Sequence, residues 1–267
     1  MRILLASLVL LMICAPAPAA DELVFGINEG VTYRITPQET RDRYREIGEI
    51  LAKLLKRTVR IEPVDDYVRL RRNLEDLKYD LAFIHPAHHS LRAMRDQKYH
   101  LVALTKGYTE YTARCLVKGD SPLKRAQDIK GRRLVMPDPD SITAWMVRAT
   151  LRDLALAATI STTRYQDAIP FMLDNGFNEV GCTAAGGVIR AWQSKGGRVL
   201  FESRSLPIKH LIASPGMSKG DVEIVRTFFL GLETSKENRK LLDKIGFQGF
   251  IVGDEQKLAE IAVWLGI

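Results

Sequence analysis

Short apolar runs alternate with amphipathic segments along most of this chain, and this alternation restricts its fold more than any other feature. The run Leu23 to Ile27 precedes a segment from Glu39 to Lys56, in which apolar residues recur at the spacing of one helix face. A run at Val59 to Pro63, a helical segment ending near Lys78 and a run at Asp80 to Ile84 repeat this order. Strands and helices in alternation predict right-handed βαβ units, and therefore an α/β fold with a mainly parallel sheet flanked by helices.

The alternation pauses after about residue 104 and starts again after residue 122, which predicts a second lobe of the same class. We expect its strands at 112–117, 133–136, 179–183 and 198–201, and its helices at 124–129, 142–156, 166–174 and 186–194. The chain is expected to cross between the lobes near 108–112 and near 204–210. Lobe 1 would then comprise residues 21–108 plus 209–267, and lobe 2 residues 109–208. Two such lobes enclose a cleft, and ligands of α/β units bind beyond the carboxyl ends of their strands.

Residues 1–20 have the pattern of a secretory signal peptide. An unbroken apolar run from Ile3 to Ile13 follows one basic residue and precedes the small residues Ala15 to Ala20. The run is shorter than the roughly 20 residues that a transmembrane helix needs. Cys14 raises the possibility of a lipid anchor, but Ile13 is bulky where lipidation motifs place a small residue. We therefore expect residues 1–20 to be removed and the mature protein to be a secreted monomer without a lipid anchor.

The net charge of +7 comes from basic residues that are interspersed with acidic ones. No basic tract carries interleaved aromatic residues, so nucleic acid is not the expected partner, whereas a mild positive field favours the capture of small anions. Cys115 and Cys182 both lie in strand-like runs, and the sequence does not decide whether they pair.

A helix start at Ser141 is the first candidate site. The first backbone N–H groups of a helix lack intrahelical partners and lie at the positive end of its dipole, so an anion could bind there together with the hydroxyls of Ser141 and Thr143. The alternative is that Asp140 or Ser141 only caps an ordinary helix.

Several segments match one known family in order and spacing. They are the strand 23–27 with Gly26, "DDY" (65–67), "YDLAFIHPAHHS" (79–90), "SPLKRAQDIKGRRLVMPDPDSITAW" (121–145), "DNGFNEVG" (174–181) and "LPIKH" (206–210). Together they resemble the phosphate, phosphite and phosphonate-binding family of periplasmic ABC-transporter receptors, and the match covers nearly all of the mature chain. The resemblance implies a two-lobed type II periplasmic binding protein with its ligand cleft between the lobes.

The resemblance also implies where the anion binds. Ser141, Thr143 and neighbouring amides would hold it from lobe 2, and Tyr67 and the turn that starts at His85 would contact it from lobe 1. A phenol at Tyr111, near a crossing between the lobes, could donate to it as well.

Departures from the family pattern restrict the ligand. A glycine is usual at His85, a second hydroxyl residue at Ile142, and a histidine where Gln166 stands. Members that hold a ligand amino group use acidic residues at places that look like Ala185 and Lys209 here, which argues against an aminoalkylphosphonate. Lys209 instead offers a positive charge to an anion.

Asn28 and Glu29 follow the first strand at its carboxyl end and are therefore candidate cleft residues. The segment "HPAHH" suggests a different site, because His85, His88 and His89 together with Glu29 could bind zinc or nickel. Against a metal, the spacing is no recognised ligand signature, and Pro86 accounts for the helix start.

We expect a periplasmic receptor that binds a small oxyanion for an ABC importer and needs no cofactor or metal. The alternatives are a receptor that reports to a membrane sensor kinase and a Zn or Ni receptor. An enzyme is not expected, since Ser141 has no G-x-S-x-G context and no paired-carboxylate motif stands out.

Overall fold

The computed structural model describes residues 22–30, 35–156 and 159–267, so the predicted signal peptide at 1–20 lies outside the described residues. The elements up to residue 136 are β1 (Leu23–Asn28), α1 (Pro37–Leu55), β2 (Val59–Pro63), α2 (Tyr67–Glu75), β3 (Leu81–Ile84), α3 (Ala87–Asp96), β4 (His100–Thr105), β5 (Arg114–Val117), the 3-10 helix η1 (Ala126–Ile129) and β6 (Arg133–Met136). Those that follow are α4 (Ile142–Asp153), β7 (Thr159–Thr162), the 3-10 helix η2 (Gln166–Ala168), α5 (Ile169–Asp174), β8 (Val180–Thr183), α6 (Gly186–Ser194), β9 (Arg198–Glu202), β10 (His210–Ala213), α7 (Lys219–Leu230), α8 (Lys236–Ile245), β11 (Phe250–Ile251) and α9 (Glu255–Leu265).

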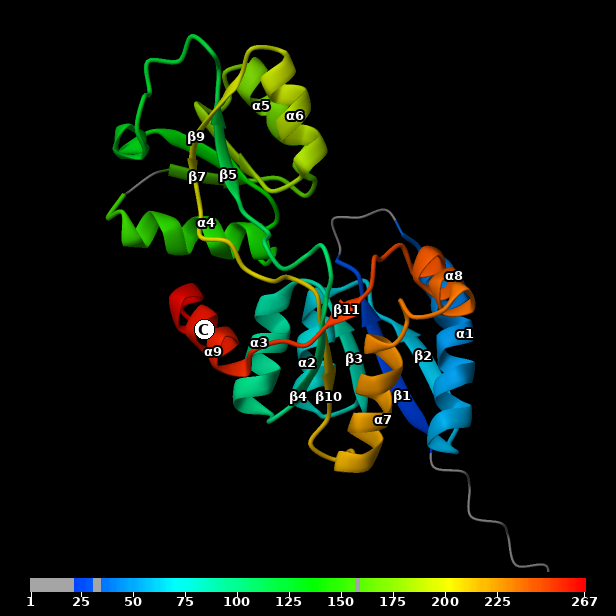
Figure 1. The fold of residues 1–267 in the computed structure, drawn as a ribbon. Coiled ribbons are helices and arrows are strands. Elements are labelled where there is room, and N and C mark those ends of the chain that lie inside the picture. The colour runs from blue at the N-terminus through cyan, green and yellow to red at the C-terminus, as the bar shows by residue number, and fades with distance from the viewer. Residues whose placement is uncertain (1–21, 31–34, 157–158) are drawn as a thin grey trace, which may run out of the picture.

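The strands form two separate sheets, each flanked by helices (Figure 1). One has the order β11-β4-β10-β3-β1-β2 and the other the order β7-β6-β8-β5-β9. We call the unit around the first sheet lobe 1 and the unit around the second lobe 2. The α/β class and the two-sheet architecture predicted from the sequence are confirmed.

The ladders are mixed, whereas mainly parallel ladders were expected. In lobe 1, β1 pairs in parallel with β2 and β3, but β10 runs antiparallel to both β3 and β4. In lobe 2, β6 pairs in parallel with β7 and β8, and β5 is antiparallel to β8 and β9. The cause is the double crossing, since β10 and β5 each enter a sheet from the opposite lobe. Strand β7 was not expected, because its residues are mostly exposed and polar.

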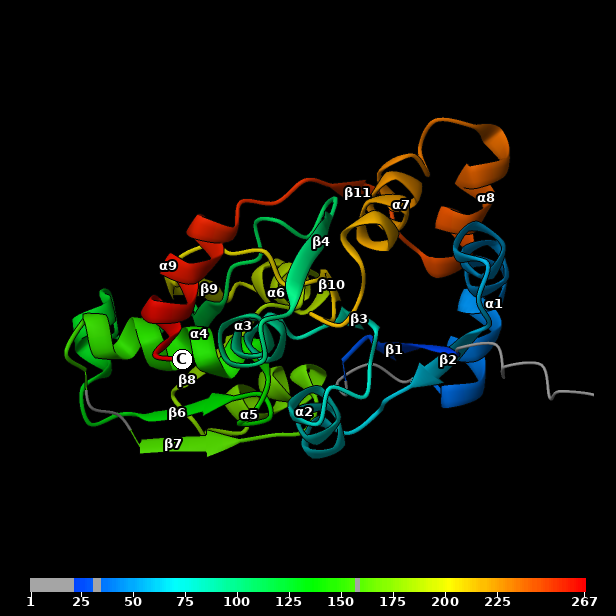
Figure 2. The ribbon, with the colours of Figure 1, turned by 90° about the horizontal axis from the view of Figure 1, so that it is seen from below.

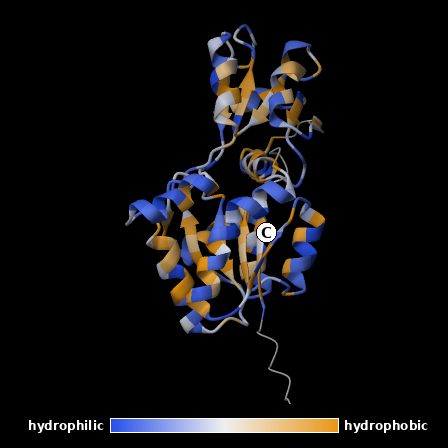
Figure 3. Ribbon diagram, turned by 90° about the vertical axis from the view of Figure 1, so that its right-hand side faces the viewer, coloured by the Kyte–Doolittle hydropathy of each residue, from blue (hydrophilic) through white to orange (hydrophobic). Residues whose placement is uncertain are grey.

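Helices cover both faces of the lobe 1 sheet (Figure 2). Side chains alternate along β3, with Leu81 and Phe83 in the core beneath α1, α7 and α8, and Ala82 and Ile84 in the core beneath α2 and α3. This explains why β3 is a continuous apolar run. Figure 3 shows the same distribution, with apolar strands inside and hydrophilic helix faces outside. Gly26 of β1 is needed for packing, because a Cβ there would lie 2.7 Å from the ring of Tyr79.

Cys115 and Cys182 form a disulfide between β5 and β8, where they are directly opposite in the ladder. The sequence left this pairing open. The bond ties together two strands inside lobe 2 and does not cross between the lobes.

The two crossings between the lobes pair with each other. Tyr111, between β4 and β5, forms an isolated antiparallel bridge with Leu206, between β9 and β10, through two hydrogen bonds of 3.0 Å. The lobes therefore meet at a short two-stranded hinge.

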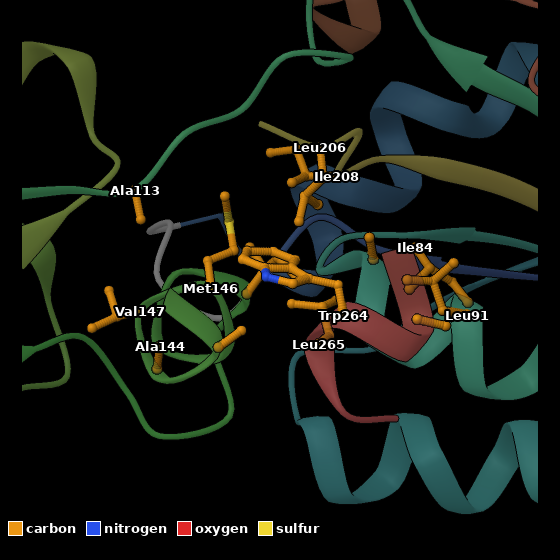
Figure 4. Close-up of a cluster of buried hydrophobic side chains, with 14 of the residues drawn as sticks. Ile84, Leu91, Ala113, Ala144, Met146, Val147, Leu206, Ile208, Trp264 and Leu265 are labelled. Carbon is orange, nitrogen blue, oxygen red and sulfur yellow. The ribbon is translucent and has the colours of Figure 1, made fainter. Parts of the chain in front are cut away.

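An apolar seam lies beside this hinge, where α9 of lobe 1 packs against α3 and also against α4 of lobe 2. Met146 of α4 and Trp264 of α9 lie next to each other there (Figure 4). The Trp264 indole N–H also donates to Asp153 Oδ2 at 2.6 Å. One hydrophobic core thus continues from one lobe into the other.

Candidate functional site

The start of α4 lies at the junction and not in bulk solvent. Ser141 is its N-cap, and its Oγ accepts a hydrogen bond from the amide of Ala144 at 3.2 Å. The side chains of Ser141 and Thr143 are nevertheless buried, with 4% and 1% of each residue exposed. The positive end of the helix is therefore covered by protein, which makes its dipole more effective than at an open surface.

Tyr111, Thr143 and Gln166 come together beside this helix start. The Tyr111 hydroxyl is 3.5 Å from Thr143 Oγ1, and burial raises the pKa of Tyr111 although hydrogen bonds with Thr143 and Gln166 partly offset this. Gln166 Oε1 accepts from Thr183 Oγ1 at 2.8 Å and from the Ala184 amide at 2.9 Å. With its oxygen occupied, Gln166 has its NH₂ group left as a donor, and it hydrogen-bonds with Tyr111.

On the lobe 1 side, Tyr67 and His85 are both buried near helix starts. Tyr67 is the first residue of α2, and its ring centroid lies 5.1 Å from that of His89. His85 follows β3, and its Nδ1 lies 3.2 Å from the carbonyl oxygen of Ile208. Burial and the nearby charge of Lys209 lower the pKa of His85 to about 3, so this imidazole is neutral. The N-cap of α3, Pro86, makes no side-chain capping hydrogen bond.

Asn28 connects the end of β1 to neighbouring loops. Its Nδ2 donates to the Val64 carbonyl at 2.6 Å, and its Oδ1 accepts from the Gly30 amide at 3.1 Å. Glu29 accepts from the Tyr44 hydroxyl at 2.8 Å and pairs with Arg43 at 3.2 Å. Both side chains thus have structural partners, and their role toward a ligand stays a prediction.

Lys209 is buried at the start of β10, with its Nζ 4.3 Å and 4.5 Å from the ring centroids of Tyr108 and Phe247. Burial lowers the pKa of Lys209 to about 8, and the charge of Glu29 partly offsets this effect. Lys209 therefore remains mostly charged at neutral pH.

Asp140 makes contacts across the junction that the sequence did not reveal. Its carboxylate forms an ion pair with Arg71 of α2, and Oδ1 lies 3.2 Å from His88 Nε2 on α3. Trp145 of α4 donates its indole N–H to the same oxygen at 3.4 Å and lies under the guanidinium of Arg92. Burial raises the pKa of Asp140, but these histidine and arginine partners outweigh it and leave the pKa well below its ordinary value. These contacts hold the loop before α4 against α2 and α3.

A groove with a volume of about 410 Å³ opens beside Asp140. It is lined by residues 65–68 from lobe 1 and by residues 138–140 and 162–164 from lobe 2. Of the residues predicted for the site, Tyr67 lines this groove.

His88 and His89 lie together at the junction, whereas His85 and Glu29, which the metal hypothesis grouped with them, have other contacts. Their potential partner in the described part of the chain is Asp140, since His85 contacts the Ile208 carbonyl and Glu29 contacts Tyr44 and Arg43.

No helix in the described ranges is long and apolar enough to cross a membrane.

Solved structures with a similar fold span nearly the whole chain. A structure of XAC2383 from Xanthomonas citri bound to ATP superposes with a TM-score of 0.74 at 12% identity, covering 92% of this chain and 97% of that one. PhnD1 from Prochlorococcus marinus in complex with methylphosphonate gives a TM-score of 0.67 at 14% identity, covering 91% and 96%. A binding protein component of an ABC phosphonate transporter, PA3383 from Pseudomonas aeruginosa, gives 0.65 at 16% identity, covering 92% and 85%.

No curated protein matches the chain by sequence. The sequence model of one family, described as "ABC transporter, phosphonate, periplasmic substrate-binding protein", matches residues 30–258. The fold is that of a type II periplasmic binding protein, as expected. This chain belongs to the family of periplasmic substrate-binding proteins of phosphonate ABC transporters.

Proposed function

We propose that this protein binds a small tetrahedral oxyanion, such as phosphate, phosphite or a phosphonate, between its lobes and delivers it to an ABC permease. The family is a substrate-binding component of a transporter and not an enzyme, and membership implies a periplasmic location. The identity of the anion and the residues that hold it are the new parts of the proposal.

The buried start of α4 carries the proposal. Ser141 Oγ uses a lone pair for the amide of Ala144, so its hydrogen is available for a second acceptor. The hydroxyl of Thr143 and the first amides of α4 are beside it, and the helix dipole favours negative charge at the same point. Tyr111 and Gln166 add a phenol and an amide from the hinge side of the junction.

Lobe 1 supplies the opposing contacts. Tyr67 and His85 offer a phenol and a neutral imidazole, and Lys209 contributes positive charge from the start of β10. Asn28 and Glu29 border this region at the carboxyl end of β1, where we propose that they shape the cleft. An anion that contacts both lobes stabilises their closed arrangement relative to an open one, which couples binding to closure.

Two structural relatives support an anionic ligand. One was solved with methylphosphonate and another with ATP. At 14% and 12% identity these likenesses extend to the fold, so the ligand of this chain has to be measured.

Calorimetric titration of the purified protein with methylphosphonate, phosphite, phosphate and sulfate tests the proposal. We expect at least one of these anions to bind, and the double variant Ser141→Ala, Thr143→Val to weaken that binding. Each hydrogen bond to a charged group contributes about 1.5–3 kcal/mol, so the dissociation constant should rise by roughly 100-fold or more.

Ser218→Ala is the matched control. Ser218 caps α7 by accepting from the Asp221 amide at 3.0 Å, as Ser141 caps α4, but it lies away from the junction. The Ser218→Ala variant should lose the cap of α7 and keep the wild-type affinity for the anion. Absence of binding by all four anions, or wild-type affinity in the double variant, would contradict the proposal.

A further inference from the structure

Three potential metal ligands from the two lobes meet at the junction. His88 and His89 come from α3 of lobe 1 and Asp140 from the loop before α4 of lobe 2, and one ligand atom of each lies within 4.8 Å of the others. His88 Nε2 is 3.2 Å from Asp140 Oδ1, and His89 Nε2 is 3.9 Å from Asp140 Oδ2. The two imidazole rings are 4.0 Å apart, so both rings face the same carboxylate.

Three of the four imidazole nitrogens of this cluster have no hydrogen-bond partner in the described part of the chain. Both residues are almost fully buried, and among the described residues His88 Nδ1, His89 Nδ1 and His89 Nε2 form no hydrogen bond. A buried polar atom left unpaired costs about 1–3 kcal/mol, and in native proteins such atoms commonly mark a bound water or ion. His89, with neither nitrogen bonded, requires this explanation most.

The two imidazoles and one carboxylate suit a divalent cation that is borderline between hard and soft. Imidazole nitrogen and carboxylate oxygen are common ligands of Zn²⁺, and sites with three protein ligands leave a fourth position for water or another small ligand. We propose that His88, His89 and Asp140 bind a divalent transition-metal ion such as Zn²⁺ across the junction between the lobes. This inference goes beyond the anion-binding function and does not depend on it.

Three arginines surround the cluster and decide how strongly it binds. Arg71 already pairs with Asp140, and the guanidinium groups of Arg92 and Arg148 lie 4.8 Å from the centre of the Trp145 ring, close enough for their charges to act on His88. Their charge repels a cation, and Arg71 competes with it for the carboxylate. The metal must therefore displace Arg71 from at least one oxygen of Asp140, and removal of that guanidinium strengthens the site.

A bound metal has a mechanical consequence. It bridges α3 to the loop that leads into α4, beside the groove lined by Tyr67 and Asp140. The histidines belong to lobe 1 and the aspartate to lobe 2, so the ion stabilises the closed arrangement of the lobes. This effect adds to that of a bound anion.

The test is calorimetric titration of Zn²⁺ into tag-free protein stripped of metal with EDTA, repeated with Co²⁺ to record its visible absorption. We expect one Zn²⁺ per chain and visible Co²⁺ bands from a nitrogen and oxygen site. Loss of a residue that only hydrogen-bonds to a metal ligand typically costs about 10–100-fold in metal affinity. His89→Gln removes a ligand itself, so it should lower the affinity by at least about 100-fold and abolish the Co²⁺ bands. Should His89→Gln not fold, Asp140→Asn makes the same test.

Arg71→Gln should change the affinity in the opposite direction to His89→Gln and tighten Zn²⁺ binding several-fold. Two controls match these variants: His100→Gln replaces an exposed histidine, and Arg72→Gln replaces the neighbouring exposed arginine, which lies 4.0 Å from Asp76. Both should bind Zn²⁺ as the wild type does. The site is excluded if Zn²⁺ does not bind, if binding survives His89→Gln, or if Arg71→Gln weakens it. Titration of methylphosphonate in EDTA is read separately, so either proposal can fail alone.

Discussion

Two helices begin at the junction between the lobes, and their first turns are completed in different ways. The start of α4 is capped by the Ser141 hydroxyl, whereas the N-cap of α3 is Pro86, which provides no side-chain cap. The polar side chains of the first turn are hydroxyls in α4 and imidazoles in α3. Hydroxyls remain neutral at all relevant pH values and satisfy the helix without a ligand, while buried imidazoles are costly when unpaired and are sensitive to acid. The α4 start is therefore suited to holding an anion, whereas the α3 start makes the stability of the junction depend on pH.

The largest expected difference between the two starts is their response to acid. Burial lowers the pKa of His85 to about 3 and that of His88 to about 4, and His210, which contacts Ser90 of α3, is lowered by burial to a pKa of about 4. The ordinary histidine value is about 6.5. Between about pH 4 and about pH 6.5 the unfolded chain binds more protons than the folded one, so the free energy of unfolding falls as the pH falls.

Urea unfolding at about pH 7 and about pH 5 measures this effect. Each of the three histidines should cost roughly 2 kcal/mol over this interval, about 6 kcal/mol together. Asp140 stays ionised across the interval, because its partners outweigh burial and keep its pKa low. His88→Gln should reduce the pH dependence. Equal stability at the two pH values would show that these imidazoles are not held in their neutral form.

The second difference is the direction in which a side-chain substitution changes the free energy of unfolding. Ser141→Ala removes the cap of α4 and should lower the free energy of unfolding by about 1 kcal/mol. His89→Leu removes an imidazole that forms no hydrogen bond with any described residue, and should be neutral or stabilising by up to about 1 kcal/mol. Both are measured by urea unfolding in EDTA without ligand.

Ser235→Ala calibrates the cap, because Ser235 accepts from the Asn238 amide at 3.1 Å at the start of α8. It should lose as much stability as Ser141→Ala. A loss of the same size in His89→Leu would mean that the imidazole is fully paired in solution, and the contrast between the two helix starts would disappear.

The sequence predicted most of the fold, because apolar periodicity reports which faces are buried. The continuous apolar run of β3 and the helix start at Ser141 were located correctly. The mixed ladders could not be predicted, since the direction in which β10 joins its sheet depends on the path through the other lobe. The exposed β7 gave no apolar signal.

The sequence predicted site residues on both lobes, and their role toward a ligand stays a prediction. A helix start with hydroxyl residues is a local pattern, so Ser141 and Thr143 could be found from adjacent residues. The contacts of Asp140 with Arg71 and His88 join residues 69 and 52 positions apart, and no local pattern reports them. The same limit affected the metal hypothesis, which grouped His88 and His89 with His85 and Glu29, because no local pattern relates them to Asp140.

The smallest expected effect on stability concerns the hydroxyl beside the α4 start. The Tyr111 hydroxyl is 3.5 Å from Thr143 Oγ1, at the limit of a hydrogen bond, and its other partner, Gln166, keeps the bonds of its oxygen to Thr183 and Ala184 without it. Tyr111→Phe should therefore change the free energy of unfolding by about 0.5 kcal/mol or less. If the phenol donates to the anion, the same change should raise the dissociation constant by about tenfold or more.

Tyr99→Phe should show the reverse pattern. Its hydroxyl donates to the Tyr79 carbonyl at 2.9 Å inside lobe 1, so its loss should cost about 1 kcal/mol of stability and leave anion affinity unchanged. Calorimetry with the tightest anion, combined with urea unfolding, gives both quantities for both variants. Should Tyr111→Phe behave like Tyr99→Phe, the phenol would serve the fold of the hinge, and the anion would be held by the α4 start without it.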